Sequence, residues 1–363
     1  MSDDYRAQAD ALDTLIRTAI AAYALDDAAF DELACAVFAH QLRWNAPYAA
    51  YARSLGITEH ALPRTIAALP AVPGAAFKDA AFCTVAPERA GLWFETSGTT
   101  QARSGRHFLE TPALYEAALL AGFDRAMLAD GARLRYLMLV PDPHERPHSS
   151  LGYMMATIAR ERGDGHDGWY LRDDALDVAG FCNAVERAHA DNTALGIATT
   201  AFALLALLDQ LATAGRTLPL PAGSRVMETG GFKGRTRVVG REELYARAAA
   251  VFAIDESAIV AEYGMTELSS QYYDSPGSRW SARRIKLPVP WLRPLIVDGM
   301  GKPLPNGTVG AIRHIDCANR SSVVAVETED LGVITPEGLL LLGREEGAAL
   351  RGCSLDAEDL LRR

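Results

Sequence analysis

The sequence predicts an α/β protein with a largely parallel sheet, followed by a smaller β-rich part. From about residue 61 to 280, short apolar runs that fit buried strands alternate with segments of helical periodicity. After Trp280 the pattern changes to short strand-like pieces separated by turns that contain Pro and Gly. The length of 363 residues suggests about two domains, and a hydrophobic share of 49% suffices for a sizeable core.

Four segments follow one another along the chain. In residues 1–60, apolar residues recur at helical spacing between Leu12 and Ile20 and again between Asp27 and Trp44, so we expect a helical N-terminal cap. Residues 61–280 form the expected α/β core, residues 281–343 a β-rich subdomain, and residues 344–363 a short C-terminal tail with Cys353. The expected core strands are 92–95, 136–140, 194–198, 224–228 and 258–262, and the expected core helices begin at Thr111-Pro112, near Ala201 and at Arg241. The expected strands of the β-rich subdomain are 310–317, 323–328 and 338–343.

Composition excludes several classes of protein. The 46 acidic residues outnumber the 36 basic ones, which argues against a surface for nucleic acid. The most apolar stretch, residues 195–208, is shorter than the roughly 20 residues of a membrane span. No basic and apolar leader opens the sequence, and the five cysteines are scattered without a C-x-x-C pair. We therefore expect a cytoplasmic protein without disulfides, structural zinc or a membrane span.

The segment 95–106 follows an expected strand and is rich in hydroxyl groups. It contains Thr96, Ser97, Gly98, Thr99 and Thr100. Hydroxyls and main-chain N–H groups at a tight glycine turn suit phosphate oxygens, and Arg103 and Arg106 add positive charge. A polar surface turn is the alternative interpretation.

Two further turns follow expected strands at the edge where parallel sheets bind ligands. In 262–268, Tyr263 offers a ring face for a base, Thr266 a hydroxyl for a phosphate, and Glu267 a hard oxygen for Mg²⁺. The segment 228–235 contains the glycine pair Gly230 and Gly231, then Lys233. Each turn alone also fits a structural role, as a common Tyr-Gly turn or a glycine turn with solvated basic residues.

A fourth group lies in the β-rich part and near the end of the chain. Asp330, within 328–332, offers a carboxylate for vicinal ribose hydroxyls. Gly343 and Arg344 follow, and Cys353 lies close to the C-terminus.

In this order the pieces resemble the adenylate-forming superfamily of acyl-CoA synthetases, luciferases and peptide-synthetase adenylation domains. Residues 96–100 match its hydroxyl-rich phosphate loop, 263–267 its Tyr-Gly-x-Thr-Glu motif, Asp330 its ribose-binding aspartate, and Gly343-Arg344 its domain hinge. Within the superfamily the sequence is more similar to acyl-protein synthetases, the long-chain fatty acid ligases of bacterial bioluminescence. The supporting strings are 76–78, 149–154, 230–235, 263–272 and 316–320, and the resemblance runs from about Asn45 to the C-terminus.

The resemblance implies a large N-terminal adenylate-forming domain, with α/β subdomains and a small β subdomain, and a truncated C-terminal domain. It implies ATP and Mg²⁺ as cofactors and a carboxylic acid as substrate. Residues 96–100 would hold the phosphates, and Gly230, Gly231 and Tyr263 would bracket the adenine. Thr266 would contact the α-phosphate, Glu267 would bind Mg²⁺, and Asp330 and Arg344 would hold the ribose.

Two departures from the family pattern affect the catalytic residues. The phosphate loop continues as Gln101-Ala102-Arg103-Ser104-Gly105, so the usual loop lysine is absent, and Arg103, Arg106 or Lys233 could supply the charge. The sequence also ends about twenty residues after Gly343-Arg344, so we expect the mobile C-terminal domain of the family, with its catalytic lysine, to be essentially missing. In acyl-protein synthetases a cysteine near the C-terminus accepts the acyl group, and Cys353 stands at a matching place. An ordinary packed cysteine is the alternative.

These observations predict an acyl-adenylate-forming ligase for a fatty or aryl acid that passes the acyl group to a thiol, Cys353 first. One alternative is direct transfer to CoA, a carrier protein or an amine. Another is a non-catalytic subunit that binds nucleotide or acyl groups within a larger complex containing a reductase partner.

Overall fold

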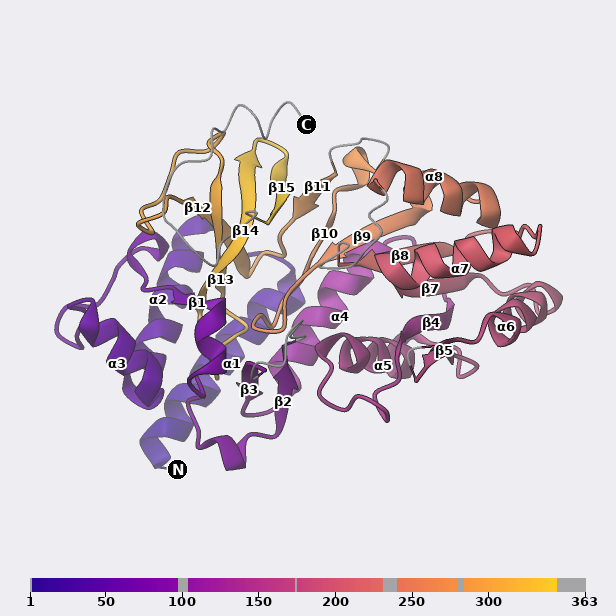
Figure 1. The fold of residues 1–363 in the computed structure, drawn as a ribbon. Helices are drawn as coiled ribbons and strands as arrows, with labels where there is room; N and C mark the ends of the chain where they lie inside the picture. The colour runs from indigo at the N-terminus through magenta and orange to yellow at the C-terminus, as the bar shows by residue number, and fades with distance from the viewer. Residues whose placement is uncertain (1, 97–103, 174, 231–239, 280–283, 345–363) are drawn as a thin grey trace. The chain divides into compact units, whose positions relative to one another are not determined.

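The computed structural model describes residues 2–96, 104–173, 175–230, 240–279 and 284–344 (Figure 1). The chain divides into two compact units, each with its own core. The first contains the described residues of Met1–Ala121, Met265–Gln271 and Ile285–Arg363, and the second those of Gly122–Gly264 and Tyr272–Arg284. The domain boundaries expected at residues 60, 280 and 343 stay predictions.

The second unit is built on a largely parallel sheet. Its strand order is β10 (Tyr272–Asp274), β9 (Ile259–Tyr263), β8 (Arg225–Thr229), β7 (Leu195–Thr200), β4 (Arg135–Pro141), β5 (Gly168–Arg172) and β6 (Ala175–Leu176). Strands β9, β8, β7, β4 and β5 are parallel, whereas β10 and β6 run antiparallel to their neighbours. The carboxyl ends of β7, β8 and β9 therefore meet at one edge of this sheet.

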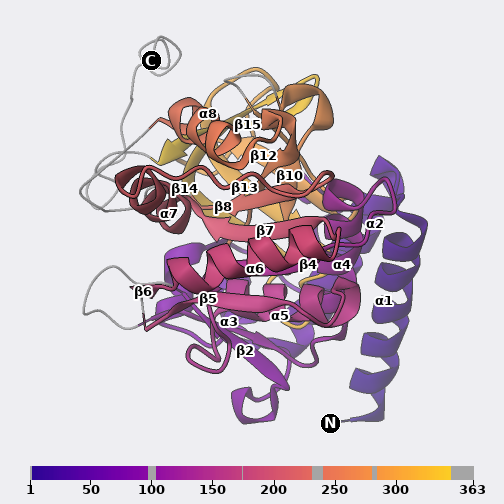
Figure 2. The same ribbon diagram turned by 90° about the vertical axis from the view of Figure 1, so that its right-hand side faces the viewer.

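Helices cover this sheet, which explains why its central strands are apolar on both faces. One face packs against α6 (Val178–Ala190), α7 (Ala201–Thr213) and α8 (Arg241–Phe252) through a continuous core (Figure 2). On β4 the side chains of Leu137 and Leu139 enter that core, while Tyr136 packs against Phe123 of α4 (Ala113–Met127). Helix α5 (Ser150–Arg162) connects β4 to β5.

The first unit combines helices with an antiparallel sheet. Its helices are α1 (Asp3–Ala22), α2 (Asp27–Trp44) and α3 (Ala46–Ser54), and its sheet order is β12 (Leu292–Val297), β13 (Gly310–Asp316), β14 (Ala325–Thr335), β15 (Gly338–Arg344) and β11 (Ile285–Leu287). Strand β1 (Val72–Pro73) pairs with β14, and β2 (Leu92–Glu95) forms a hairpin with β3 (Arg106–Leu109). A short 3₁₀ helix, η2 (Gly74–Lys78), follows β1.

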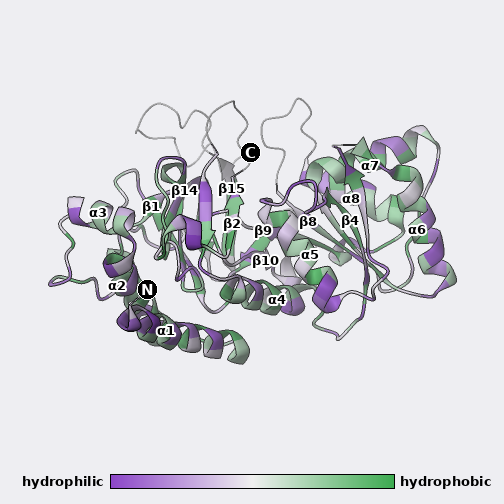
Figure 3. Cartoon of the chain, turned by 90° about the horizontal axis from the view of Figure 1, so that it is seen from below, coloured by the Kyte–Doolittle hydropathy of each residue, from purple (hydrophilic) through white to green (hydrophobic). Residues whose placement is uncertain are grey.

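Helix α1 shows why the N-terminal residues form helices. Ser2 caps it by accepting a hydrogen bond from the Tyr5 N–H, and the helix is amphipathic, with hydrophilic and hydrophobic residues interspersed along it in Figure 3. Its buried residues recur at helical spacing: Tyr5, Ala9, Leu12, Ile16, Ala19 and Ile20.

The fold confirms the predicted α/β class and the existence of the predicted strands and helices, with most ends shifted by one or two residues. The strand 92–95, expected among the core strands, instead pairs with β3 in a separate hairpin of the first unit. The largest difference concerns the strand expected at 323–328. It continues as β14 to Thr335, so Asp330 lies within the strand, beyond the end expected at 328. No helix among the described residues has both the length and the apolar character that crossing a membrane requires.

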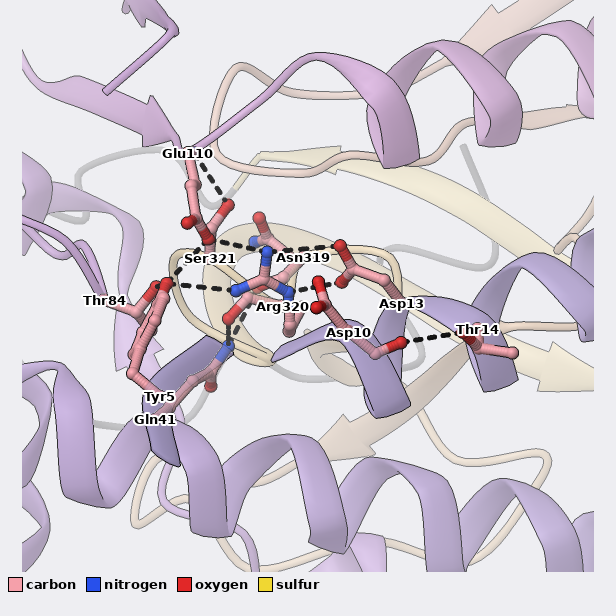
Figure 4. A network of polar contacts seen from close by, with 10 residues as sticks. All are labelled: Tyr5, Asp10, Asp13, Thr14, Gln41, Thr84, Glu110, Asn319, Arg320 and Ser321. Atoms are coloured by element: carbon pink, nitrogen blue, oxygen red, sulfur yellow. Dashed lines mark hydrogen bonds and ion pairs between the residues drawn. The ribbon is translucent and has the colours of Figure 1, made fainter. Parts of the chain in front are cut away.

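A buried ionic network joins α1 to the loop between β13 and β14 (Figure 4). The guanidinium of Arg320, whose side chain is 3% exposed, pairs with Asp13 at 2.5 Å and with Glu110 at 2.8 Å. The Tyr5 hydroxyl donates to Glu110 at 2.6 Å. Burial raises the pKa of Asp13, an effect that the neighbouring Arg320 only partly offsets. The network therefore depends on Arg320 to compensate two acidic groups that are largely removed from water.

His40 is buried beside this network. It is 3% exposed, neither ring nitrogen has a hydrogen-bond partner within the described part of the chain, and the ring lies 5.3 Å from that of Tyr5. Burial, with help from the charge of Arg320, lowers the pKa of His40 to about 4, and Glu110 opposes this shift. We expect His40→Phe to raise the free energy of unfolding at neutral pH by about 1 to 3 kcal/mol, because two unsatisfied buried nitrogens are removed.

The same substitution tests the pH dependence. The pKa of His40 lies below its ordinary value of 6.5, so the unfolded chain takes up the proton first, and stability is lost as the pH falls from 6.5 towards 4. Between pH 6.5 and 4, the free energy of unfolding of His40→Phe, measured by thermal unfolding, should change less steeply with pH than that of the wild type. The difference in slope should correspond to the uptake of about one proton. The exposed His60, replaced by Phe, serves as the control and should leave the slope unchanged. An unchanged slope in His40→Phe would contradict the assignment.

Candidate functional site

The hydroxyl-rich segment forms the connection of the β2–β3 hairpin, and the structure describes its two ends. The N–H of Thr96 donates to the carbonyl of Gly105 at 2.9 Å, and the N–H of Gly105 donates to the Thr96 hydroxyl oxygen at 2.9 Å. This reciprocal pair closes the base of the loop. The Thr96 hydroxyl therefore helps to shape the loop by accepting this hydrogen bond.

Gly105 has little room for a side chain. A Cβ there would lie 3.2 Å from the main-chain carbon of Phe77 and 3.2 Å from the Thr96 side chain. We expect Gly105→Ala to push the loop base apart and to lower the free energy of unfolding by about 1 to 3 kcal/mol. Denaturant unfolding measures the loss. Ser104→Ala is the neighbouring control and should unfold almost like the wild type, and an equal loss in both variants would contradict the steric explanation.

The second candidate segment is a tight turn at the start of residues 265–271. The N–H of Leu268 donates to the Met265 carbonyl at 3.1 Å, which places Thr266 and Glu267 at the two central positions. Thr266 is partly exposed, whereas Glu267 is 8% exposed. A Cβ on Gly74 would lie 3.8 Å from a carboxylate oxygen of Glu267, so η2 begins beside this side chain.

The end of β13 and the loop after it hold this turn in place. Asn319 donates from Nδ2 to the Glu267 carbonyl at 2.9 Å and to the Val323 carbonyl at 2.7 Å. Asp316 accepts from the N–H of Ser269 at 2.9 Å and from the Ser270 hydroxyl at 2.8 Å. Burial raises the pKa of Asp316 to about 6, although these hydrogen bonds act in the opposite direction.

His107 connects the hairpin to the same loop. Its Nε2 lies 2.7 Å from Oδ1 of Asn319, and the ring is fully buried. Burial lowers the pKa of His107 to about 4, against the opposing effect of its hydrogen bond to Asn319. The ring is therefore neutral at pH 7. Its Nε2 is the donor to Asn319, because Nδ2 of Asn319 already donates to two carbonyl groups.

Asp330 lies in β14, where its main chain pairs with Arg344 of β15. The N–H of Asp330 donates to the Thr328 hydroxyl at 3.2 Å, which in turn donates to the Ile312 carbonyl at 2.9 Å. Burial lowers the pKa of the nearby His314 to about 4, while the charge of Asp330 acts to raise it.

In the second unit, the two adenine-binding candidates follow neighbouring parallel strands. Thr229 of β8 is in register with Glu262 of β9, and the Thr229 hydroxyl donates to the Glu262 carboxylate. The next residues, Gly230 and Tyr263, therefore lie side by side. Gly230 has a φ of 74°, which favours glycine, and the Tyr263 ring lies 5.7 Å from that of Tyr272.

The predicted residues thus form local groups. In the first unit Asn319 links the hairpin beyond Gly105 to the Thr266–Glu267 turn, and in the second unit Gly230 adjoins Tyr263.

Of the cations expected to replace the loop lysine, Arg106 lies over the Trp93 ring at 4.9 Å and 3.7 Å from Glu95. The following predicted residues lie outside the described part: Ser97, Gly98, Thr99, Thr100, Arg103, Gly231, Lys233 and Cys353.

Among the described residues, no group of three or more His, Cys, Asp or Glu could by itself hold a metal ion. Mg²⁺ is commonly bound through one or two carboxylates together with substrate phosphates. A site built on Glu267 alone is compatible with that chemistry, and the Mg²⁺ expectation stays a prediction.

Sequence reasoning gave no role to His107, Asn319 and Asp316 in holding the Thr266–Glu267 turn. The segment 316–320 contributes to the family resemblance, but its sequence does not indicate which residues it contacts. The one signal for His107 is its place directly before the apolar pair Phe108-Leu109, and it is a weak signal.

No family model matches the sequence, and no curated protein matches it. Among solved structures, the chain is similar to an open conformation of 2-hydroxyisobutyryl-CoA ligase in complex with 2-HIB-AMP and CoA. The TM-score is 0.63 at 14% identity, over 87% of this chain and 75% of that one. The McyG A-PCP structure complexed with phenylalanyl-adenylate matches with a TM-score of 0.50 at 18% identity, over 72% of this chain and 48% of that one.

The chain spans about half the length of several matching proteins, for example 49% of ATP-bound MatB from Rhodopseudomonas palustris, at a TM-score of 0.49 and 16% identity over 72% of this chain. At these identities the likeness shows the fold. The chain therefore has the fold of adenylate-forming enzymes.

Proposed function

We propose that this protein activates a carboxylic acid with ATP and Mg²⁺, forming an acyl-adenylate and releasing pyrophosphate. The observation that supports this most is the fold likeness over 87% of the chain to a ligase whose solved structure holds an acyl-AMP. The hydroxyl-rich hairpin connection and the Thr-Glu turn add the residue types that this chemistry needs.

The reaction explains why such residues are required. A carboxylate oxygen attacks the α-phosphorus of ATP, the bond from that phosphorus to the bridging oxygen breaks, and pyrophosphate leaves with the electron pair. Both reactants are anions, so the protein must position them and neutralise charge. Mg²⁺, when bound, neutralises phosphate charge, and the Glu267 carboxylate is the hard oxygen ligand available to hold it.

Each remaining candidate has a role in this proposal. Residues 96–100 donate hydrogen bonds to the phosphates, and Thr266 contacts the α-phosphate. Gly230, Gly231 and Tyr263 bracket the adenine, while Asp330 and Arg344 bind the ribose. Arg103 and Lys233 supply the positive charge that the loop lysine provides in the family pattern.

For the second step we propose acyl transfer to the thiol of Cys353, as the likeness to acyl-protein synthetases suggests, with a fatty or aryl acid as substrate. Transfer to CoA, a carrier protein or an amine is the alternative within the same chemistry. A different class of function is also an alternative: a subunit without catalytic turnover that binds nucleotide or acyl groups in a complex with a reductase.

A screen of ATP–pyrophosphate exchange over fatty and aryl acids, with and without Mg²⁺, tests the first step. We expect exchange with at least one acid and none when Mg²⁺ is chelated. ATP binding without exchange for any acid would instead favour the non-catalytic subunit.

Intact-mass spectrometry after incubation with acid and ATP tests the second step. We expect the mass of one acyl group on the wild-type protein and none on Cys353→Ala. An active enzyme without an adduct would favour direct transfer to an external acceptor.

A further inference from the structure

The Asn319 side chain is the most completely bonded group near the candidate site. It is 0% exposed, and its two N–H bonds go to the carbonyl groups of Glu267 and Val323. Its Oδ1 accepts from Nε2 of His107 at 2.7 Å and from the Ser269 hydroxyl at 3.1 Å. An amide with two donors and one oxygen meets all four partners, which an isosteric carboxylate could not do.

These bonds connect two parts of the chain that the proposed function assigns to one nucleotide. His107 is the second residue after Gly105, which closes the phosphate loop, and the Glu267 carbonyl belongs to the proposed metal-binding turn. Segments more than 150 residues apart in sequence are thus joined through one buried amide.

Asp316 secures the far side of the same turn. Its carboxylate accepts from the Ser269 N–H and the Ser270 hydroxyl, and the indole of Trp291 donates to that hydroxyl at 3.0 Å. The main chain is therefore fixed immediately after Glu267 as well as at its carbonyl. Side chains at the centre of so constrained a turn have little freedom to change direction.

We propose that Asn319 and His107 are positioning residues that fix the Thr266–Glu267 turn relative to the arm of the hairpin that follows the phosphate loop. Their function is to hold the Glu267 carboxylate where it binds the metal of the nucleotide complex. The inference rests on the proposed function, because it concerns the same metal and nucleotide.

The test compares isosteric variants of two buried amides. Asn319→Asp removes both N–H donors and places a carboxylate against two carbonyl groups. Asn45→Asp is the matched control: Asn45 is also 0% exposed, and its Nδ2 donates at 2.9 Å to the Ser322 carbonyl in the same loop, away from the Glu267 turn. A second pair, His107→Gln and His107→Leu, keeps or removes the donor to Asn319.

Three quantities are measured for each variant: the unfolding temperature, the Mg²⁺ concentration for half-maximal pyrophosphate exchange, and the rise in unfolding temperature on adding Mg²⁺ with ATP. Residues that orient metal ligands typically change metal affinity or activity by about 10- to 100-fold. We expect Asn319→Asp and His107→Leu to raise the Mg²⁺ requirement by that factor and to lose most of the Mg²⁺-dependent thermal shift. Asn45→Asp should lose stability with an unchanged Mg²⁺ requirement, and His107→Gln should restore much of the wild-type requirement.

The outcomes separate the inference from the function on which it rests. Suppose that the wild-type protein is active and that Asn319→Asp is less stable but has an unchanged Mg²⁺ requirement. This result would overturn the positioning role and leave the proposed function intact. A wild-type protein with neither exchange nor a thermal shift would overturn both. If Asn319→Asp does not fold, the same three measurements on His107→Gln and His107→Leu test the positioning role.

Discussion

Replacing Arg320 with methionine should lower the free energy of unfolding by about 3 to 5 kcal/mol, as expected when one member of a buried ionic network is removed. The substitution leaves the carboxylates of Asp13 and Glu110 without their cation, and both are largely withdrawn from water (Figure 4). Denaturant unfolding at neutral pH measures the loss. The variant should regain stability on mild acidification, because protonation removes the uncompensated charges.

Arg43→Met provides the comparison. Arg43 of α2 pairs at 2.5 Å with Asp4 of α1, the helix that also carries Asp13, but both side chains are about half exposed, at 48% and 50%. Exposed pairs contribute about 0 to 1 kcal/mol, so this variant should unfold almost like the wild type. Equal losses in the two variants would mean that the Arg320 network does not behave as a buried one.

Replacing Glu267 with glutamine should reduce the rate of pyrophosphate exchange by about 100- to 1,000-fold, the range seen when one preorganised electrostatic group is lost from an active site. The amide keeps the shape of the side chain but has no charge for Mg²⁺. Exchange kinetics as a function of Mg²⁺ concentration provide the measurement, with unfolding temperature as a check on folding.

Glu337→Gln, in an exposed turn of the same unit, controls for a change of one charge. It should leave exchange unchanged. If Glu267→Gln keeps the wild-type rate and Mg²⁺ dependence, Glu267 is not the metal ligand.

The sequence predicts most of the second unit because its strands have strong local patterns. The residues of β4 form an apolar run ended by Pro141, and β9 is a short apolar strand before a Tyr-Gly turn. The position of Asp330 is harder to predict, because β14 continues through the polar residues 327–330. The register pairs Glu327 with Arg313 of β13 and Asp330 with Arg344 of β15, so these polar residues continue the strand.

The candidate site was predictable only in part. Gly230, Tyr263, Thr266 and Glu267 lie at or shortly after the carboxyl ends of β8 and β9, where a chain-order motif proposes them, and their roles stay predictions. Asn319 contacts His107 across 212 residues and Arg320 contacts Asp13 across 307, and both contacts are between buried polar groups. A single sequence indicates neither the burial of such side chains nor their partners, because both are decided by tertiary packing.

The most direct test of acyl-adenylate formation follows an oxygen atom. The protein is incubated with ATP, Mg²⁺ and an acid that supports exchange, labelled with heavy oxygen in its carboxyl group, and the AMP released after acyl transfer is analysed by mass spectrometry. Attack of the carboxylate on the α-phosphorus predicts one labelled oxygen in the AMP. AMP without label, or label found only in phosphate or ADP, would contradict the proposed activation through an acyl-adenylate.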